Sequence, residues 1–201
     1  KNWIKAKYRE CGVVPKGDKV YKLGPREEAL KQLPEEAQVR LRHAYERLDQ
    51  LEQQEREAER QMIQQGRHFP EVARFTAVPG VGTVGACTFF SFLQIPDRFR
   101  DKHDLWSYAG LKVITKESAG KPIGKPHLTT GGVKALKTMS RHSFLGCLRV
   151  DRGNNPIANY YRHRREAGLK PHAARLTTQR KILSILLHLW KTGEEFNPNK
   201  V

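Results

Sequence analysis

Residues 34–65 carry the pattern that most constrains the fold of this chain, a series of apolar residues at alternating spacings of three and four. Such a heptad seam predicts a long helix that pairs with another helix, within the chain or between chains. The alternative is a long amphipathic helix that packs on its own domain. The seam consists of Ala37, Leu41, Ala44, Leu48, Leu51, Ala58 and Met62, and Glu55 fills its one gap.

The boundaries of this helix are marked in the sequence. Pro34 suits the first turn of a helix, Glu35 and Glu36 place carboxylates near the positive helix end, and Gly66 is a natural stop. The sequence therefore predicts a linker region at 1–33, poorly defined because prolines and glycines interrupt its short apolar clusters. This region is followed by a coiled-coil helix at 34–66, a compact helical domain at 67–196 and a tail at 197–201.

The positive charge is concentrated in one part of the chain. The net charge of the 201 residues is +16, and residues 65–191 hold 22 lysines and arginines against 7 aspartates and glutamates. A surface this basic usually binds a polyanion, because neutralising phosphates releases counterions. We therefore expect DNA or RNA as the partner of residues 65–191.

The cysteines and the hydropathy limit the class of protein. Cys11, Cys87 and Cys147 are widely spaced and form no CxxC pair, which argues against a disulfide framework or a structural zinc site. No apolar run approaches the length of a membrane span, and no signal peptide is visible. We expect a protein of the reducing cytoplasm that is not associated with a membrane.

Two helices joined by a glycine turn are predicted at residues 71–93. A short helix from Glu71 to about Val78 is followed by the sequence Pro-Gly-Val-Gly at 79–82, and a second helix runs from Thr83 to about Leu93. This is a helix-hairpin-helix pattern, in which the backbone of Gly80, Val81 and Gly82 can approach a phosphate at a helix N-terminus. The alternative is an αα-corner that needs two glycines only to turn.

The remaining chain is predicted to be mostly helical. Helices are expected at about 102–108, after Thr130 with Leu136, Met139, Phe144 and Leu148 inward, at 157–168, and from Pro171 onward with Ile182, Ile185, Leu186 and Leu189 inward. The stretch near residues 111–125 leaves room for a small β-hairpin. The predicted fold class is therefore mainly α, a long coiled-coil helix followed by a compact helical domain with a helix-hairpin-helix motif.

Several basic side chains are candidates for nucleic-acid contact. The segment "YYRHRR" at 160–165 suits phosphate binding through guanidinium groups and base stacking through tyrosines, although a solvated helix face is the simpler alternative. Arg175, Arg180 and Lys181 are expected on the solvent side of the last helix. The candidates are Lys116, Lys121, Lys125, Lys134, Lys137, Arg141, Arg162, Arg164, Arg165 and Arg180.

Ser118 lies in the polar run "TKESAGKPIG" and is a candidate nucleophile. A serine hydroxyl attacks a phosphodiester only if a base removes its proton and cations counter the charge growing on the phosphate. Lys116, Lys121 and Lys125 can supply the cations, but no obvious base is nearby in the sequence. On the residues alone, Ser118 is more simply a turn residue.

Three aspartates precede or begin the helix predicted at 102–108. Asp97, Asp101 and Asp104 could suggest a metal site, but their spacing fits helix capping and the first helical turn better. No metal ligands are therefore predicted in this chain.

Four blocks of the sequence, in order, resemble a known family. They are "AVPGVGTVGACTFFSFL", "FRDKHDLWSYAGL", "ESAGKPIGKPHLTTGGVKALK" and "NNPIANYYRHRREAGLKPHAARLTTQRKILSILLHLWKTGEEF". Over about residues 69–196 the chain resembles the C-terminal transposase domain of the insertion-sequence family numbered one-ten, also called bridge RNA-guided recombinases. The helix at 34–65 takes the place of that family's coiled coil, and "WIKAKYRECGV" resembles its linker.

The resemblance implies a serine recombinase. It implies that Ser118 attacks a DNA phosphodiester and forms a transient phosphoserine link, after which the strand is exchanged. It also implies a bridge RNA that reads the target and donor DNA by base pairing, and a protein of the bacterial or archaeal cytoplasm that is associated with the nucleoid. The heptad seam predicts a homo-oligomer formed through the coiled coil. The residues 67–196 would then be the serine transposase domain.

The chain departs from the family pattern in two ways. The turn reads Ser-Ala-Gly-Lys where a second glycine is common, and "LTTGGV" replaces a basic "TKRGN" segment. The resemblance also leads us to expect that the family's N-terminal RuvC-like domain, whose four acidic residues hold Mg²⁺, lies outside this chain. We therefore expect no cofactor in this chain and no recombination by it alone. The alternative function is a non-catalytic helix-hairpin-helix module for nucleic-acid binding and dimerisation.

Overall fold

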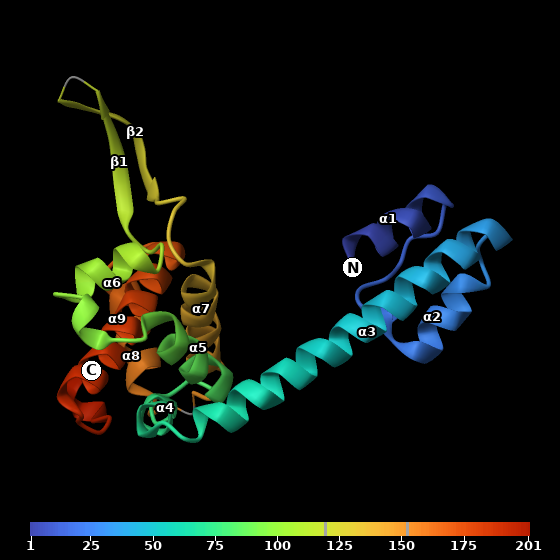
Figure 1. The fold of residues 1–201 in the computed structure, drawn as a ribbon. Coiled ribbons are helices and arrows are strands. Elements are labelled where there is room, and N and C mark those ends of the chain that lie inside the picture. The colour runs from blue at the N-terminus through green and yellow to red at the C-terminus, as the bar shows by residue number, and fades with distance from the viewer. Residues whose placement is uncertain (119, 152) are drawn as a thin grey trace. The chain divides into compact units, whose positions relative to one another are not determined.

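The computed structural model describes residues 1–118, 120–151 and 153–201, without the side chains of Lys116, Glu117, Lys121 and Pro122. The chain forms two compact units, Lys1–Gln61 and Met62–Val201. Both are built mainly of helices, and one two-stranded antiparallel sheet is present within the described ranges (Figure 1). The prediction of a mainly α fold with a small β-hairpin is therefore confirmed.

The first unit contains more regular structure than the sequence predicted. Residues 1–33 were expected to be poorly defined, yet they contain α1 (Asn2–Glu10), the 3-10 turn η1 (Lys19–Tyr21) and α2 (Leu23–Leu30), which pack with the first part of α3 (Glu35–Gly66). The prolines and glycines lie between or at the start of these helices. The buried core consists of Ile4, Tyr8, Val20, Leu30, Leu33, Leu41 and Tyr45.

Polar contacts also fix this unit. The guanidinium group of Arg26 donates to both carboxylate oxygens of Asp49, at 2.9 and 2.8 Å, and this bidentate pair lowers the pKa of the Asp49 carboxyl. The buried Tyr45 hydroxyl donates to the Tyr8 hydroxyl at 3.1 Å. Burial raises the pKa of both tyrosines, so both stay protonated. Whether residues 1–33 also act as a linker stays a prediction.

The predicted heptad seam is used within the first unit over its N-terminal half. Leu41 is fully buried, and Ala37, Ala44 and Leu48 pack against the same core. Leu51 is 56% exposed, and Ala58 is exposed. The first half of the seam therefore packs on its own unit, as the alternative predicted, whereas pairing of the second half with another chain stays a prediction.

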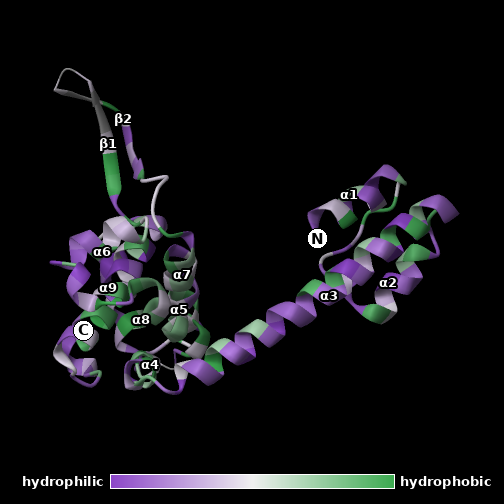
Figure 2. Cartoon of the chain, in the orientation of Figure 1, coloured by the Kyte–Doolittle hydropathy of each residue, from purple (hydrophilic) through white to green (hydrophobic). Residues whose placement is uncertain are grey.

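The second unit is a helical body from which a β-hairpin projects (Figure 1). The long helix α9 packs against α4, α6, α7 and α8. Figure 2 shows green, apolar segments on the helices of this body. Its elements are the last turn of α3, α4 (Pro70–Thr76), α5 (Thr83–Leu93), η2 (Pro96–Arg98), α6 (Lys102–Tyr108), β1 (Val113–Ser118), β2 (Lys121–Leu128), α7 (Lys134–Arg149), α8 (Pro156–Glu166), α9 (Pro171–Thr192) and η3 (Pro198–Lys200).

Most predicted inward residues of these helices are buried, with one exception. Leu136, Met139 and Phe144 of α7 lie in the core, whereas Leu148 is 37% exposed and Cys147 is buried in its place. Cys147 lies three positions after Phe144, so the buried face of α7 passes through Cys147, and Leu148 is turned outward. On α9, Ile182, Leu186 and Leu189 are buried, and Ile185 is partly buried.

Asp101 caps α6, as the spacing predicted. Its carboxylate accepts from the backbone N–H of His103 at 2.7 Å and of Asp104 at 3.1 Å. Asp104 pairs with Arg100, which lowers the pKa of the Asp104 carboxyl. Among the side chains that the structure describes, which do not include Glu117, no group of three or more acidic, histidine or cysteine side chains could hold a metal. None of the helices described combines the length and apolarity needed to cross a membrane.

Candidate nucleic-acid interface and serine hairpin

Ser118 lies at the tip of the hairpin. It is the last residue of β1 and pairs with Lys121, the first residue of β2, and it is exposed. The register runs from Val113 opposite Leu128 at the base to this pair at the tip. A hydroxyl in this position is accessible to a large substrate. Among the side chains that the structure describes, none forms a hydrogen bond with Ser118 Oγ.

The base of the hairpin is fixed to the helical body by Arg180 of α9. Its Nε donates to the carbonyl of Leu111 at 2.9 Å, and its Nη2 donates to the same oxygen. The guanidinium carbon lies 5.1 Å from the centroid of the Trp106 ring, and Trp106 Nε1 donates to the carbonyl of Arg180 at 3.2 Å and to Ser184 Oγ at 3.1 Å. Burial lowers the pKa of Arg180 from its ordinary value.

The backbones of Gly110, Gly131 and Gly132 lie in close contact at the base of the hairpin. A Cβ added at Gly132 would lie 2.4 Å from Gly110 N, and one added at Gly110 would lie 2.7 Å from Gly131 O. Both Gly110 and Gly132 have positive φ values, 68° and 94°. Val133 N donates to Tyr108 O at 2.7 Å. The segment "TTGGV" therefore forms a close backbone contact at the foot of the hairpin.

Replacing Arg180 with Met should loosen the hairpin base. The variant leaves the Leu111 carbonyl without its charged donor, and such a hydrogen bond contributes about 1.5–3 kcal/mol. We expect that loss in the free energy of unfolding by urea, with faster hydrogen exchange in residues 111–128. Arg175→Met is the control, because Arg175 is exposed on the same helix. Equal effects of the two substitutions would contradict the anchoring role.

The turn between α4 and α5 has a packed side and an open side. Gly80 has a φ of 83°, and a Cβ added there would lie 2.4 Å from both Cys147 Sγ and Ser143 O of α7. Cys147 Sγ donates to Pro79 O at 2.7 Å. Gly82, in contrast, is exposed, with nothing within 4 Å of an added Cβ, and it is the N-cap of α5 without a side-chain hydrogen bond.

The three predicted residues of this turn therefore differ. Gly80 packs on α7, and Val81 is buried and donates its N–H to Val78 O at 3.0 Å. Only the N-terminus of α5 at Gly82 is open to solvent and carries the positive end of a helix dipole. Phosphate binding here, and the turn's role as a helix-hairpin-helix motif, stay predictions.

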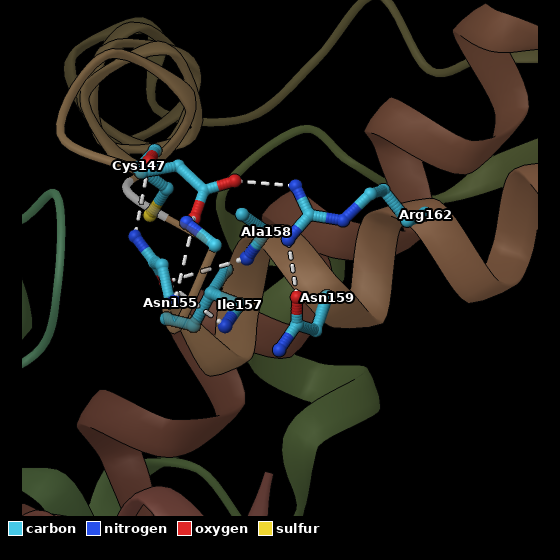
Figure 3. Close-up of polar contacts among 8 residues, drawn as sticks. Cys147, Asn155, Ile157, Ala158, Asn159 and Arg162 are labelled. Carbon is cyan, nitrogen blue, oxygen red and sulfur yellow. Dashed lines mark hydrogen bonds and ion pairs between the residues drawn. The ribbon is translucent and has the colours of Figure 1, made fainter.

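Arg162 of α8 takes part in a polar network (Figure 3). Its guanidinium group donates to Asp151 and to the side-chain oxygen of Asn159, and it lowers the pKa of the Asp151 carboxyl. Asn155 caps α8 by accepting from Ile157 N and Ala158 N, and its Nδ2 donates to Cys147 O at 2.9 Å. The network joins the C-terminus of α7 to the N-terminus of α8, so Arg162 has a structural role.

The other basic residues of α8 are more open. Arg164 lies over the Tyr160 ring at 4.9 Å, and Lys181 of α9 lies 5.7 Å from the same centroid. Arg165 Nη1 donates to the carbonyl of Leu169 at 2.5 Å. Both Arg164 and Arg165 are exposed. Tyr160 therefore joins basic side chains of two helices, an arrangement suited to phosphates beside a stacked base.

The remaining predicted contacts lie on α7 and on the hairpin. Lys134 and Arg141 are exposed, and Lys137 is partly buried. Lys125 is exposed on β2, whereas the side chains of Lys116 and Lys121 lie outside the described part of the structure. Two further features were missed from the sequence. Asn155 before Pro156 is a recognisable helix start, but no local pattern indicates that Trp106 contacts Arg180.

Two comparisons with known proteins bear on the class of this chain. Residues 72–161, which include the α4–α5 turn and Ser118, match the model of a family described as Transposase IS116/IS110/IS902 family. A curated protein of Streptomyces coelicolor, the insertion element IS110 uncharacterized 43.6 kDa protein, is 32% identical over 119 residues. That alignment covers 59% of this chain and 28% of the relative. Both findings support the IS110 transposase family, in agreement with the resemblance of the sequence blocks.

Proposed function

We propose that this chain is part of an RNA-guided DNA transposase in which Ser118 is the nucleophile. The observation that carries the proposal is the exposed position of Ser118 at the tip of a hairpin whose base is held by Arg180. The match of residues 72–161 to a transposase family supports DNA as the substrate. The basic surface of the second unit supports the binding of DNA and of a guide RNA.

The proposed reaction is a transfer of the phosphoryl group to serine and back. Ser118 Oγ forms a bond to the phosphorus and gives its proton to a base, and the bond from phosphorus to one deoxyribose oxygen breaks. The leaving oxygen takes up a proton from an acid and becomes a hydroxyl. A hydroxyl of the exchanged strand then attacks the phosphoserine and gives its proton to a base, and the leaving Ser118 Oγ takes up a proton from an acid. No oxidant or reductant is needed.

The base for Ser118 is proposed to come from outside this chain. We assign it to an acidic, RuvC-like domain of a complete protein, which would also hold Mg²⁺. The part of this chain that the structure describes does not fit such an ion, because no three potential metal ligands lie close together there. We expect the chain alone to bind nucleic acid without recombining DNA.

The DNA affinity of this chain should depend steeply on salt. If about six phosphates are neutralised, the logarithm of the binding constant should fall with the logarithm of salt concentration with a slope of about −5. Replacing exposed Lys134 and Arg141 with Gln should reduce the steepness of the slope by about 2. Fluorescence anisotropy with labelled duplex DNA measures both values. Arg60→Gln is the control, because Arg60 pairs with Glu57 in the first unit. A nearly flat slope would contradict nucleic-acid binding.

A second candidate function is a non-catalytic module for nucleic-acid binding and dimerisation. It is favoured by the open N-terminus of α5 at Gly82. This function predicts the same salt slope but no covalent product. Detection of a protein–DNA adduct therefore separates the two functions.

A further inference from the structure

A groove of about 460 Å³ lies between α1 and α3 of the first unit. Ile4 is buried in its floor and Leu48 is partly buried there. Two large apolar side chains on the groove are exposed, Trp3 by 50% and Leu51 by 56%. An exposed tryptophan beside an apolar floor is a suitable surface for a flat, stacked ring.

The rim of this groove is basic. Arg40, His43 and Arg47 lie on one side of α3 at spacings of three and four, and Lys1 lies at the other side of the groove. Throughout residues 1–61, all of which the structure describes, no acidic side chain lines the groove and none lies within 4 Å of the Arg40 or Arg47 guanidinium group. Lys7 Nζ lies 5.6 Å from the centroid of the Trp3 ring.

Arg40 and Arg47 keep their charge at the groove because no carboxylate pairs with them. Arg9 and Arg56 of this unit are also unpaired, but they do not line the groove. Several other basic residues have acidic partners, which neutralise much of their charge locally. The pairs are Lys1–Glu52, Lys5–Asp18, Lys7–Glu10, Arg26–Asp49, Arg42–Glu27, His43–Glu46 and Arg60–Glu57.

We propose that this groove binds single-stranded nucleic acid, with a base stacked on Trp3 and phosphates held by Arg40 and Arg47. A positively charged groove with an exposed aromatic ring is the arrangement that binds single strands without reading their sequence. The positive rim complements phosphodiesters, and the exposed ring needs unpaired bases. A duplex offers no free base face, so it fits this surface less well. This proposal rests on the proposed function in one respect, because each of them requires that the chain binds nucleic acid.

The test uses a labelled oligo-dT of twenty nucleotides that carries 5-bromouracil. Trp3→Ala should weaken binding about fivefold or more, and Arg40→Gln with Arg47→Gln should weaken it further and reduce the steepness of the salt slope by about 1.4. Arg42→Gln is the matched control, since Arg42 is exposed on the same helix and pairs with Glu27. It should change the affinity less than twofold. Ultraviolet cross-linking followed by mass spectrometry should place adducts in the peptide that contains Trp3.

Two results would overturn the proposal. In the first, cross-links fall only in residues 62–201 and the groove variants bind like the wild type, which leaves the proposed function of the second unit untouched. In the second, an acidic amphipathic peptide binds the groove and the oligonucleotide does not displace it, so that a protein is the partner. A Ser118→Ala chain should still cross-link at Trp3, so failure of the catalytic assignment is seen separately.

Discussion

Replacing Ser118 with Ala should abolish the covalent protein–DNA adduct. In the presence of the acidic domain and the guide RNA, we expect adduct formation and recombination to fall by at least about 1000-fold, since loss of a nucleophile typically has effects of this size or larger. The substitution removes one hydroxyl from an exposed hairpin tip, so the free energy of unfolding should not change. Denaturing gel electrophoresis with labelled DNA measures the adduct.

Thr115→Ala provides the matched control for this experiment. Thr115 is an exposed hydroxyl residue of the same strand, three positions before Ser118. This variant should form the adduct at the wild-type rate. An undiminished adduct in Ser118→Ala would show that the catalytic assignment is wrong. Wild-type protein that binds DNA and never forms an adduct in the complete system would favour the non-catalytic module.

Replacing Gly80 with Ala should strongly destabilise the second unit. The new Cβ would lie 2.4 Å from Ser143 O and 2.5 Å from Cys147 N, backbone atoms of α7 that cannot turn away. The left-handed backbone at Gly80 adds about 1–2 kcal/mol for a residue with a side chain. With about 1–3 kcal/mol for overpacking, the free energy of unfolding should fall by about 2–5 kcal/mol. Urea unfolding followed by circular dichroism measures it.

Gly82→Ala is the control in the same turn. Gly82 has a φ of −77°, and an added Cβ meets nothing within 4 Å. Loss of a favourable N-cap residue should cost less than about 1 kcal/mol. Comparable destabilisation by both substitutions would mean that Gly80 does not pack on α7 as described.

Local sequence patterns predicted the helices of the second unit well. The helices at Thr83–Leu93 and Lys102–Tyr108 were predicted with their observed bounds, because Gly-rich turns and the Asp101 cap mark their ends. The first unit was predicted poorly. Its helices α1 and α2 are short, and they are stabilised by contacts with α3 that are distant in sequence, such as Tyr8 with Tyr45.

In the candidate site, too, the sequence predicted features that depend on neighbouring residues and missed those that depend on contacts between distant residues. Residue type and net charge identify basic side chains, but they do not show which of these side chains already form hydrogen bonds or ion pairs within the protein. Arg162 donates to Asp151, and Arg180 donates to a carbonyl 69 residues away in the chain. Neither contact has a local signature, so the sequence assigned both to nucleic acid. Their binding of nucleic acid stays a prediction, in competition with these structural roles.

The cysteines allow the two units to be followed separately. Burial raises the pKa of Cys87 and raises that of Cys147 to about 12, so neither thiol should react while the second unit is folded. Cys11, which is partly exposed, belongs to the first unit. The labelling rate of each thiol in increasing denaturant thus reports the opening of its own unit. An intact chain therefore carries natural chemical reporters for ranking the stability of its two halves.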